Sequence, residues 1–591
     1  MRRRNTVLVT VVLLGLAAVA VPTALTASSG TVAADDHGSQ EFIQDCAAEP
    51  PEDFAAPADG NEVIGWVDGQ WYNEPLEIDV EGGLTEDEVE KLSARTAARF
   101  EVMRCLPAEE GVPPVEIKSR EEFVDEQSGI YQGLNESTQL ADNTKFETML
   151  IIDSESESTE VREENRGATV GGTYNFVTDT ITVVSDDPES LLIDEEVLVH
   201  EIGHAVQDQQ FNISRYERPT MDADRGILSL IEGDVTYIEN RYLDACENEQ
   251  WEEPCVTESF GNESDGDSGG SDSEPANWGL YFSEFQPYSD GPSLIQSVYD
   301  DGGWEAVNDL YQSPPRTAYY SAFPGSYGEF EPVDLEVPDR STDEWERLTF
   351  ADGPNYDTIG VAGISAMFKA PTYETGGQFN IYAPADILNV GPDGEVDDSD
   401  PLNYNQPETE GWRGDELYTY RNDANGTGAV WEIAWASEED AAPFVESYQQ
   451  LIDYRGGEPV EGYEYTYTFG EDSEFDMALT IVPDGDRVTV VKAPSVEELT
   501  AVDQGAELVE ASEDNGTSSE DNSSDDTDGE DSSDDTDGDD TDDTDTSDGD
   551  EGNDTETPTG TETDGSDGPG FGVGVAVVAV LAAALVAARR S

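Results

Sequence analysis

Two of the three histidines in this 591-residue chain fall in one short motif, His200-Glu201-Ile202-Gly203-His204. Positions four apart share a face of a helix, so both imidazoles can bind one metal ion while Glu201 lies beside it. Zn²⁺ accepts imidazole nitrogen and carboxylate oxygen in tetrahedral sites. The motif therefore predicts a zinc site with His200 and His204 as ligands and Glu201 placed to act on a water molecule.

A hydrolytic zinc site needs a third protein ligand and one open position for water. Glu232, in Leu230-Ile231-Glu232-Gly233-Asp234-Val235, lies 28 residues after His204 on the next predicted helix. A helix–loop–helix turn would bring its carboxylate back to the metal. Other acidic residues are close enough to substitute, and they are Asp222, Asp224, Asp234 and Glu239. The remaining histidine, His37, falls in a predicted linker and is expected to be inert.

At these residues the chain resembles the gluzincin metallopeptidases, the thermolysin-like group, whose third ligand is a Glu on a following helix. The resemblance covers roughly residues 61–338. The segment from Gly302-Gly303-Trp304 to Pro314-Pro315-Arg316-Thr317 is similar to exported bacterial and archaeal relatives of that group. The block from Gly411-Trp412-Arg413-Gly414-Asp415 to Trp435 is similar to the domain that accompanies the peptidase in such proteins.

The resemblance implies zinc-assisted hydrolysis of a peptide or protein substrate, with Glu201 as general base and then general acid. The tetrahedral oxyanion needs a further donor. Thermolysin-like enzymes use histidine and tyrosine, and no further histidine lies in the predicted metallopeptidase domain, so tyrosine, arginine or backbone must serve. The candidates are Tyr319, Tyr320, Tyr327 and Arg316. Asp194 or Asp208 could orient a ligand histidine, as acids behind the metal ligands often do.

The hydrophobic pattern predicts the elements that must position these residues. Asp187-Pro188 is a cap and first-turn proline for the motif helix, which we expect to end near Phe211. Thr85 and Glu88 form a capping box for a helix to about Arg104. Further helices are predicted at about 225–245, 293–299, 304–311, 356–369 and 437–452. Strands are predicted within 63–78 and at 114–117, 148–152, 172–176, 180–184, 415–420, 427–435, 463–469, 478–482 and 488–492.

Both ends of the chain are typical of targeting segments. Arg2-Arg3-Arg4, an apolar stretch from Val7 and then small residues predict a secretory signal peptide. An apolar run from Phe571 to Ala588 follows Pro569-Gly570 and precedes Arg589-Arg590, which predicts a transmembrane segment. This tail resembles the PGF-type C-terminal sorting signal of haloarchaeal surface proteins, removed in exchange for a lipid. A permanent membrane anchor is the alternative, and both place the protein at the cell surface.

The net charge of −107 comes from 134 acidic and 27 basic residues, of which only five are lysine. Such a surface is typical of a protein kept soluble at very high salt, and in ordinary buffer it repels itself. Nucleic acid is excluded as a partner because no basic patch can neutralise phosphates. Nothing in the pattern indicates an oligomeric state.

Four cysteines in an exported chain predict disulfides. Cys246 and Cys255 are nine residues apart around turn residues, which favours a local bridge and leaves Cys46 with Cys105. A cysteine-bound metal is the alternative, but no C-x-x-C occurs. Sequons permit glycosylation at Asn135, Asn212, Asn262, Asn425, Asn515, Asn522 and Asn553.

We therefore expect an α+β protein with a zincin-like metallopeptidase domain, made of a small sheet, the active-site helix and a helical subdomain, and a smaller α+β domain. The expected parts are a signal peptide (1–34), a linker (35–60), the metallopeptidase domain (61–342), the accessory α+β domain (343–505), a disordered acidic Asp/Ser/Thr/Gly stalk (506–568) and the sorting signal with its transmembrane helix (569–591). A cell-surface zinc metallopeptidase is the leading hypothesis. The alternatives are a non-catalytic surface structural or binding protein on a peptidase-like fold, and a zinc hydrolase acting on a non-peptide bond.

Overall fold

The structure, a computed structural model, describes residues 42–508 except 77, 79–82, 132–133, 186–192, 249, 252, 254, 257–274, 329, 352, 392–393, 395, 471–472 and 507. The predicted signal peptide, most of the predicted stalk and the predicted sorting signal lie outside the described residues. Within that described part, no helix is long and apolar enough to cross a membrane.

Helices and strands are mixed along the chain, which confirms the α+β class. The helices of seven residues or more are α1 (Glu86–Arg104), α2 (Arg120–Gln127), α3 (Glu136–Thr148), α4 (Ser158–Thr169), α5 (Glu195–Phe211), α6 (Met221–Glu247), α7 (Trp278–Leu310), α9 (Gly360–Glu374), α10 (Glu438–Tyr454) and α11 (Val496–Val502). Among the described residues, the shorter helices are η1 (Gly60–Glu62), η3 (Ile213–Arg215) and α8 (Tyr319–Ala322).

The strands form three sheets. A two-stranded ribbon pairs β1 (Trp66–Val67) with β2 (Gln70–Trp71). A three-stranded sheet has the order β3 (Val115–Ser119), β5 (Thr180–Ser185) and β4 (Gly172–Asn175), with β3 parallel and β4 antiparallel to β5. The seven-stranded sheet is antiparallel, in the order β6 (Trp345–Arg347), β7 (Trp412–Asn422), β8 (Thr427–Trp435), β12 (Arg487–Ala493), β11 (Ala478–Asp484), β10 (Thr466–Phe469) and β9 (Gly457–Pro459).

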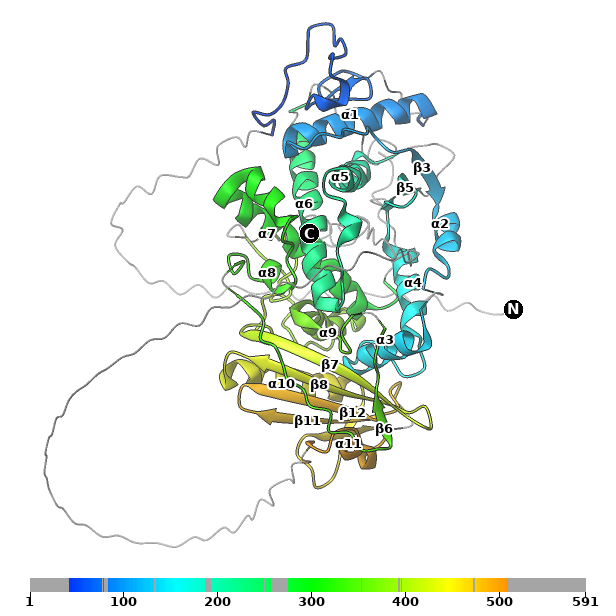
Figure 1. Cartoon of the computed structure of the whole chain (residues 1–591), viewed down its shortest axis with the longest axis vertical. Helices are drawn as coiled ribbons and strands as arrows, with labels where there is room; N and C mark the ends of the chain where they lie inside the picture. Colours follow the sequence, from blue (N-terminus) through cyan, green and yellow to red (C-terminus); the bar gives the residue numbers. More distant parts are fainter. Residues whose placement is uncertain are drawn as a thin grey trace, which may run out of the picture. The chain divides into compact units, whose positions relative to one another are not determined.

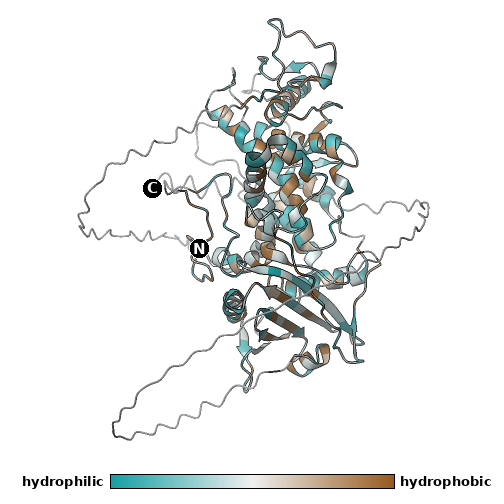
Figure 2. Cartoon of the chain, turned by 60° about the vertical axis from the view of Figure 1, so that its left-hand side comes forward, coloured by the Kyte–Doolittle hydropathy of each residue, from teal (hydrophilic) through white to brown (hydrophobic). Residues whose placement is uncertain are grey.

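One hydrophobic core joins the helices that carry the predicted site. Phe100 of α1, Ile202 of α5 and Ile231 of α6 belong to it, each no more than 2% exposed. Figure 1 shows α5 and α6 beside each other beneath α1. Figure 2 shows hydrophobic and hydrophilic residues mixed along the helices of the chain. Residues 198–207 of α5 are buried on every face, so this helix lies inside the helical region.

The backbones of α6 and α7 touch at a pair of glycines. A Cβ atom added to Gly233 would lie 2.5 Å from the carbonyl carbon of Gly291, and one added to Gly291 would lie 2.8 Å from the Gly233 Cα. Any larger residue at either position would push the helices apart. Gly233 directly follows Glu232, so this contact brings α7 against the part of α6 where the predicted third ligand lies.

A second core links the helical region to the seven-stranded sheet. It includes Phe146 at the end of α3, Phe282 of α7, Ile364 of α9 and Trp431 of β8, all at most 1% exposed. Helix α9 packs against α6 and α7 on one side and β7 on the other (Figure 1). This core therefore contains residues from both sides of the predicted domain boundary at 343.

Several predicted elements are confirmed. The Thr85–Glu88 capping box begins α1, the β4–β5 hairpin forms, and Ser437 caps α10. Both predicted disulfides are present, Cys46–Cys105 and Cys246–Cys255.

Other predicted elements are wrong. Helix α5 begins at Glu195 with Asp194 as its cap, rather than at Asp187-Pro188, which lie outside the described residues. The apolar run 148–152 is a buried turn after α3, with Leu150 at a positive φ of 57°, and not a strand.

Two further predictions are confirmed, with different bounds. Among its described residues, the segment 63–78 holds the short strands β1 and β2. The helices predicted at 293–299 and 304–311 both form within α7, which begins earlier, at Trp278, and is interrupted between them by a non-helical Gly303.

Candidate metal centre

Helix α5 presents His200 and His204 on one face, one turn apart. Their Nε2 atoms are 3.1 Å apart, and the residues are only 1% and 4% exposed. The helix is fixed at its start by Asp194, which accepts from the Glu196 amide, and ends at Asn212 in the left-handed conformation. The motif is thus helical and buried, as the spacing predicts.

Helix α6 brings Glu232 to the same point. Its Oε2 lies 3.4 Å from His200 Nε2 and 3.0 Å from His204 Nε2. Tetrahedral bonds of about 2.0–2.1 Å to Zn²⁺ would place ligand atoms roughly 3.3 Å apart. The three observed separations bracket that value, so the two imidazoles and the carboxylate fit a zinc ion. His200, His204 and Glu232 form one of two potential metal-binding groups among the described residues; the other contains the bridged Cys246 and Cys255, whose sulfurs are unavailable to a metal.

The three side chains hold charge at this buried point. Burial disfavours the charged form of His200, but its hydrogen bonds to Glu232 and Glu239 prevail and raise its pKa well above 6.5. Burial likewise opposes ionisation of Glu232, yet the His204 charge and hydrogen bonds from both imidazoles lower its pKa to about 2. The Glu232 carboxylate likewise raises the pKa of His204 against burial. Negative charge at this point thus favours a cation, whether protons on the imidazoles or a divalent metal that would replace them.

The outer nitrogen of each imidazole has an oxygen partner. His200 Nδ1 lies 2.7 Å from Glu239 Oε2, and His204 Nδ1 lies 3.1 Å from Gln207 Oε1. The Gln207 amide nitrogen donates to the Ile231 carbonyl and the Tyr311 hydroxyl, so its oxygen faces His204 as an acceptor. With Nδ1 donating in both histidines, both Nε2 atoms are left to bind a metal.

The predicted orienting acids do not fill this role. Asp194 caps α5, and Asp208 accepts hydrogen bonds from the Ile213 amide and the Tyr174 hydroxyl. Glu239, which the sequence offers only as a substitute third ligand, takes the orienting position. It lies two helical turns after Glu232 on α6, and that spacing is the signal that could have found it.

Glu201 lies beside the three ligands and against the edge strand β4. Its two carboxylate oxygens are buried and make no hydrogen bond of normal geometry. A Cβ atom at Gly172 would lie only 2.9 Å from Glu201 Oε1, so glycine is needed where β4 passes the carboxylate. Burial raises the pKa of Glu201, with the two histidine charges acting against that shift. The Tyr174 amide of β4 also acts against the shift, and no side chain among the described residues hydrogen-bonds the carboxylate with normal geometry, so it is well placed to accept a proton.

Tyr288 of α7 is a site residue that the sequence does not reveal. Its ring stacks on His200 with centroids 6.1 Å apart, and its buried hydroxyl makes no hydrogen bond of normal geometry. Burial and the negative charges of Glu232 and Glu201 raise its pKa well above 10, so the hydroxyl keeps its proton. No motif surrounds Tyr288; it reaches the site because α7 meets α6 at Gly291, three residues further on.

The structure does not bring the predicted oxyanion donors to the cluster. Tyr320 donates to the Phe330 carbonyl at 2.7 Å and Tyr327 to the Ser313 carbonyl at 3.0 Å. Tyr319 stacks on Phe323 and Phe330. Arg316 donates to the Glu217 carbonyl. These side chains serve the packing of the segment after α7, and sequence proximity to the predicted ligand helix was a poor guide.

The substitute ligands also have other partners. Asp234 accepts from Arg104 and from the Tyr311 hydroxyl, both at 2.7 Å. Asp222 accepts from the Ala318 amide, and Asp224 pairs with Arg225 and Arg218. Glu232 is therefore the acid that completes the cluster.

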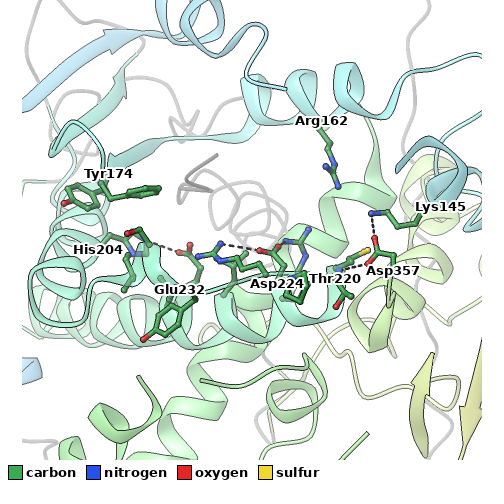
Figure 3. Close-up of a pocket in the computed structure, with 18 residues that line it drawn as sticks. Lys145, Arg162, Tyr174, His204, Thr220, Asp224, Glu232 and Asp357 are labelled. Carbon is green, nitrogen blue, oxygen red and sulfur yellow. Dashed lines mark hydrogen bonds and ion pairs between the residues drawn. The ribbon is translucent and has the colours of Figure 1, made fainter. Parts of the chain in front are cut away.

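A cavity of about 480 Å³ adjoins the cluster. His204 and Glu232 lie at one end of it, and Lys145 and Asp357 at the other (Figure 3). Tyr174 of β4 and Leu228 of α6 also line it. The cluster thus borders a space large enough to hold several amino-acid side chains.

A family described as a domain of unknown function (DUF8575) matches residues 346–503. This segment holds α9 and nearly all of the seven-stranded sheet, and it excludes the His–His–Glu cluster. Asp357 is the residue of this segment that lines the cavity. No curated protein and no solved structure matches the chain.

Proposed function

We propose that the chain is a zinc-dependent peptidase on a zincin-like fold. The observation that carries the proposal is the convergence of His200, His204 and Glu232 at zinc-ligand spacing, with the buried Glu201 carboxylate beside them. Hydrolysis requires this combination of a metal site and an adjacent base, whereas a purely structural zinc site does not need Glu201.

Each residue of the site has its own role in the proposed hydrolysis. A zinc ion held at the cluster would lower the pKa of a water molecule and polarise the scissile carbonyl. Glu201 accepts a proton as the water oxygen attacks the carbonyl carbon, and delivers it to the amide nitrogen as the C–N bond breaks. The Tyr288 hydroxyl is the donor for the developing oxyanion.

The three-stranded sheet offers a place for the substrate backbone. Strand β4 is an edge strand, and Tyr174 on it lines the cavity next to the cluster. An extended peptide can add to such an edge through main-chain hydrogen bonds. Added there, the peptide would pass Glu201, which lies against Gly172 of the same strand.

The proposal places the enzyme outside the cell, anchored at its C-terminus to the membrane or, after sorting, to a lipid. Two disulfides support an oxidising location. The acidic composition supports a very salty one.

The test is digestion of an unstructured protein by the purified chain in multimolar NaCl. We expect cleavage that stops with a chelator and returns with Zn²⁺. Glu201→Gln should bind zinc but lose hydrolysis by at least about 10²-fold, while the exposed α1 variant Glu90→Gln should behave as wild type. A chain that binds zinc but cleaves nothing would favour the binding-protein alternative.

A further inference from the structure

Cationic side chains gather around the cavity beside the metal cluster. The whole chain has 27 lysines and arginines against 134 acids. Four of these cations nevertheless line this one cavity, and they are Lys145, Arg162, Arg218 and Arg225. Because the net charge of the chain is −107, four cations around one cavity are unexpected. The partners of each cation indicate which of them can bind a ligand.

Lys145 and Arg218 are already neutralised or solvated. Lys145 forms two ion pairs of 2.9 Å, one with Asp142 and one with Asp357. Arg218 pairs with Asp224 at 3.3 Å, and its side chain is 24% exposed. Lys145 is thus neutralised by two acids, and Arg218 is the most exposed of the three arginines.

Arg162 has donors to spare. Its one ion pair among the described residues is a long contact of 3.5 Å with Asp142, and its buried Nε has no partner. Its guanidinium lies over the rings of Tyr131 and Phe146, which support the cation without using its N–H groups in the plane. Figure 3 shows the side chain pointing from α4 into the cavity.

Arg225 is the second cation with an unused donor. One of its terminal nitrogens pairs with Asp224 at 2.7 Å, while its Nε is buried without a partner. It precedes Glu232 by seven residues on α6, so the two lie two turns apart on one face. Glu284 of α7 interacts electrostatically with Arg225 and Arg162, but forms no ion pair within 4 Å among the described residues.

We propose that this cavity binds a substrate carboxylate between Arg162 and Arg225, so that the peptidase prefers an acidic group close to the scissile bond. The carboxylate belongs either to an Asp or Glu side chain or to the C-terminus of the substrate. The inference rests on the proposed peptidase function for its catalytic context. Planar guanidinium groups suit carboxylates, since two N–H donors can meet the two oxygens.

Burial makes this recognition effective at high salt. Exposed charges are screened within about 3 Å at 1 M ionic strength, whereas buried pairs are screened much less. The side chains of Arg162 and Arg225 are only 17% and 10% exposed. A preference based on them would therefore persist in multimolar salt.

The substrate side of the test uses quenched-fluorescent peptides in multimolar NaCl. The series places Glu or its isostere Gln at each position flanking the cleaved bond, with free or amidated C-termini. We expect kcat/KM to be at least about tenfold higher for Glu than for Gln at one position, or for the free than for the amidated C-terminus. The neutral peptide lacks the charge-assisted hydrogen bond to the arginines. A loss of rate on replacing Glu by Gln identifies a side-chain carboxylate, and a loss on amidation identifies the C-terminal carboxylate.

The protein side uses Arg162→Gln, with Arg487→Gln on the seven-stranded sheet as the matched control. Arg162→Gln should reduce the acid-to-neutral ratio to near one, and Arg487→Gln should keep it. Because loss of a buried arginine can disturb folding, Arg162→Lys is measured as well, and thermal unfolding is recorded for all variants. We expect Arg162→Lys to retain part of the preference.

Binding of the same peptides to Glu201→Gln, measured by fluorescence anisotropy, separates this inference from the peptidase proposal. Hydrolysis with no acid preference at any position or terminus would overturn the inference and leave the peptidase standing. Acid-selective binding that depends on Arg162, in a chain that cleaves nothing, would uphold the carboxylate site and overturn the peptidase.

Discussion

Glu239 and Glu232, two turns apart on α6, contact opposite nitrogens of the same imidazole. Glu232 approaches His200 Nε2 at 3.4 Å, and Glu239 lies 2.7 Å from Nδ1. Helix α6 thus supplies both the carboxylate of the candidate metal centre and the acid that orients one of its imidazoles. The ring of His200 is fixed by one rigid element, which makes the cluster ready for a metal before it binds.

Glu239→Gln should weaken zinc binding by about 10–100-fold, as changes of such orienting partners typically do. The amide can still accept a hydrogen bond, but it removes the negative charge that strengthens His200 as a ligand. Competition with a fluorescent zinc chelator measures the affinity, with Glu247→Gln at the exposed end of the same helix as control. Equal affinity in wild type and Glu239→Gln would show that the contact has no such role.

Tyr288→Phe should lower kcat by about 10²-fold and leave zinc content unchanged, because removing one oxyanion donor has that cost. The hydroxyl interacts with Glu232, so thermal unfolding of the variant is recorded as a check on the fold. Tyr281→Phe is a matched control, since Tyr281 also lies on α7 with a buried, unpartnered hydroxyl. If Tyr320→Phe or Tyr327→Phe reduced kcat while Tyr288→Phe did not, the donor assigned here would be wrong.

The contrast between Glu232 and Tyr288 shows what the sequence could predict. Helix periodicity and the E-G-D sequence identify Glu232, because ligand and motif lie on consecutive helices. Tyr288 lies 84 residues after His204 on a helix that contains Pro287 and Pro292. Because proline disfavours the interior of a helix, the sequence does not predict the first half of α7. Burial of this helix between two cores overrides that local preference.

Sequence patterns predict an element correctly where its hydrogen bonds join residues that are close in the sequence. The capping box of α1 and the Ser437 cap of α10 follow from residues three positions apart. They failed at Met149–Ile152, whose apolar run resembles a strand. Its burial comes instead from distant residues, such as Tyr448, which donates to the Thr148 carbonyl. A contact between residues 300 positions apart cannot be predicted from the hydrophobic pattern of one segment.

The Cys46–Cys105 bridge should stabilise the chain more than Cys246–Cys255 does. The bridges span 59 and 9 residues. The chain-entropy model gives about 4 and about 3 kcal/mol, because the longer loop is restricted more in the unfolded state. Unfolding of the two double Cys→Ser variants by urea measures the difference. A larger loss on removing the short bridge would contradict this order.

Glu101 should make the protein less stable as pH rises. Burial raises its pKa to about 8, although the Gly65 and Ala108 amides, both 2.7 Å away, act against that shift. Between its usual pKa of 4.5 and about 8, the unfolded chain loses this proton and the folded chain keeps it. The folded state binds more protons there, so its stability falls with pH, and the fall ends above about 8.

The matching measurement compares wild type and Glu101→Gln by urea unfolding from pH 4 to 9 at constant salt. The variant loses a constant amount of stability at all pH values, since the Gln amide puts an N–H donor where one of the two Glu101 oxygens accepts from a backbone amide. Between pH 4.5 and 8, we expect the free energy of unfolding of the variant to rise relative to that of wild type by on the order of 1–4 kcal/mol. A difference that does not change with pH would mean that Glu101 is ionised in the fold.

Zinc stoichiometry tests the central claim, that His200, His204 and Glu232 together hold one divalent cation. The protein is stripped with chelator, equilibrated with Zn²⁺ in multimolar NaCl, desalted into a volatile buffer and measured by native mass spectrometry. We predict one zinc per wild-type chain, and less than a tenth of that in His204→Ala and Glu232→Ala under the same conditions. Wild-type protein without zinc, or variants that retain the full equivalent, would contradict the account.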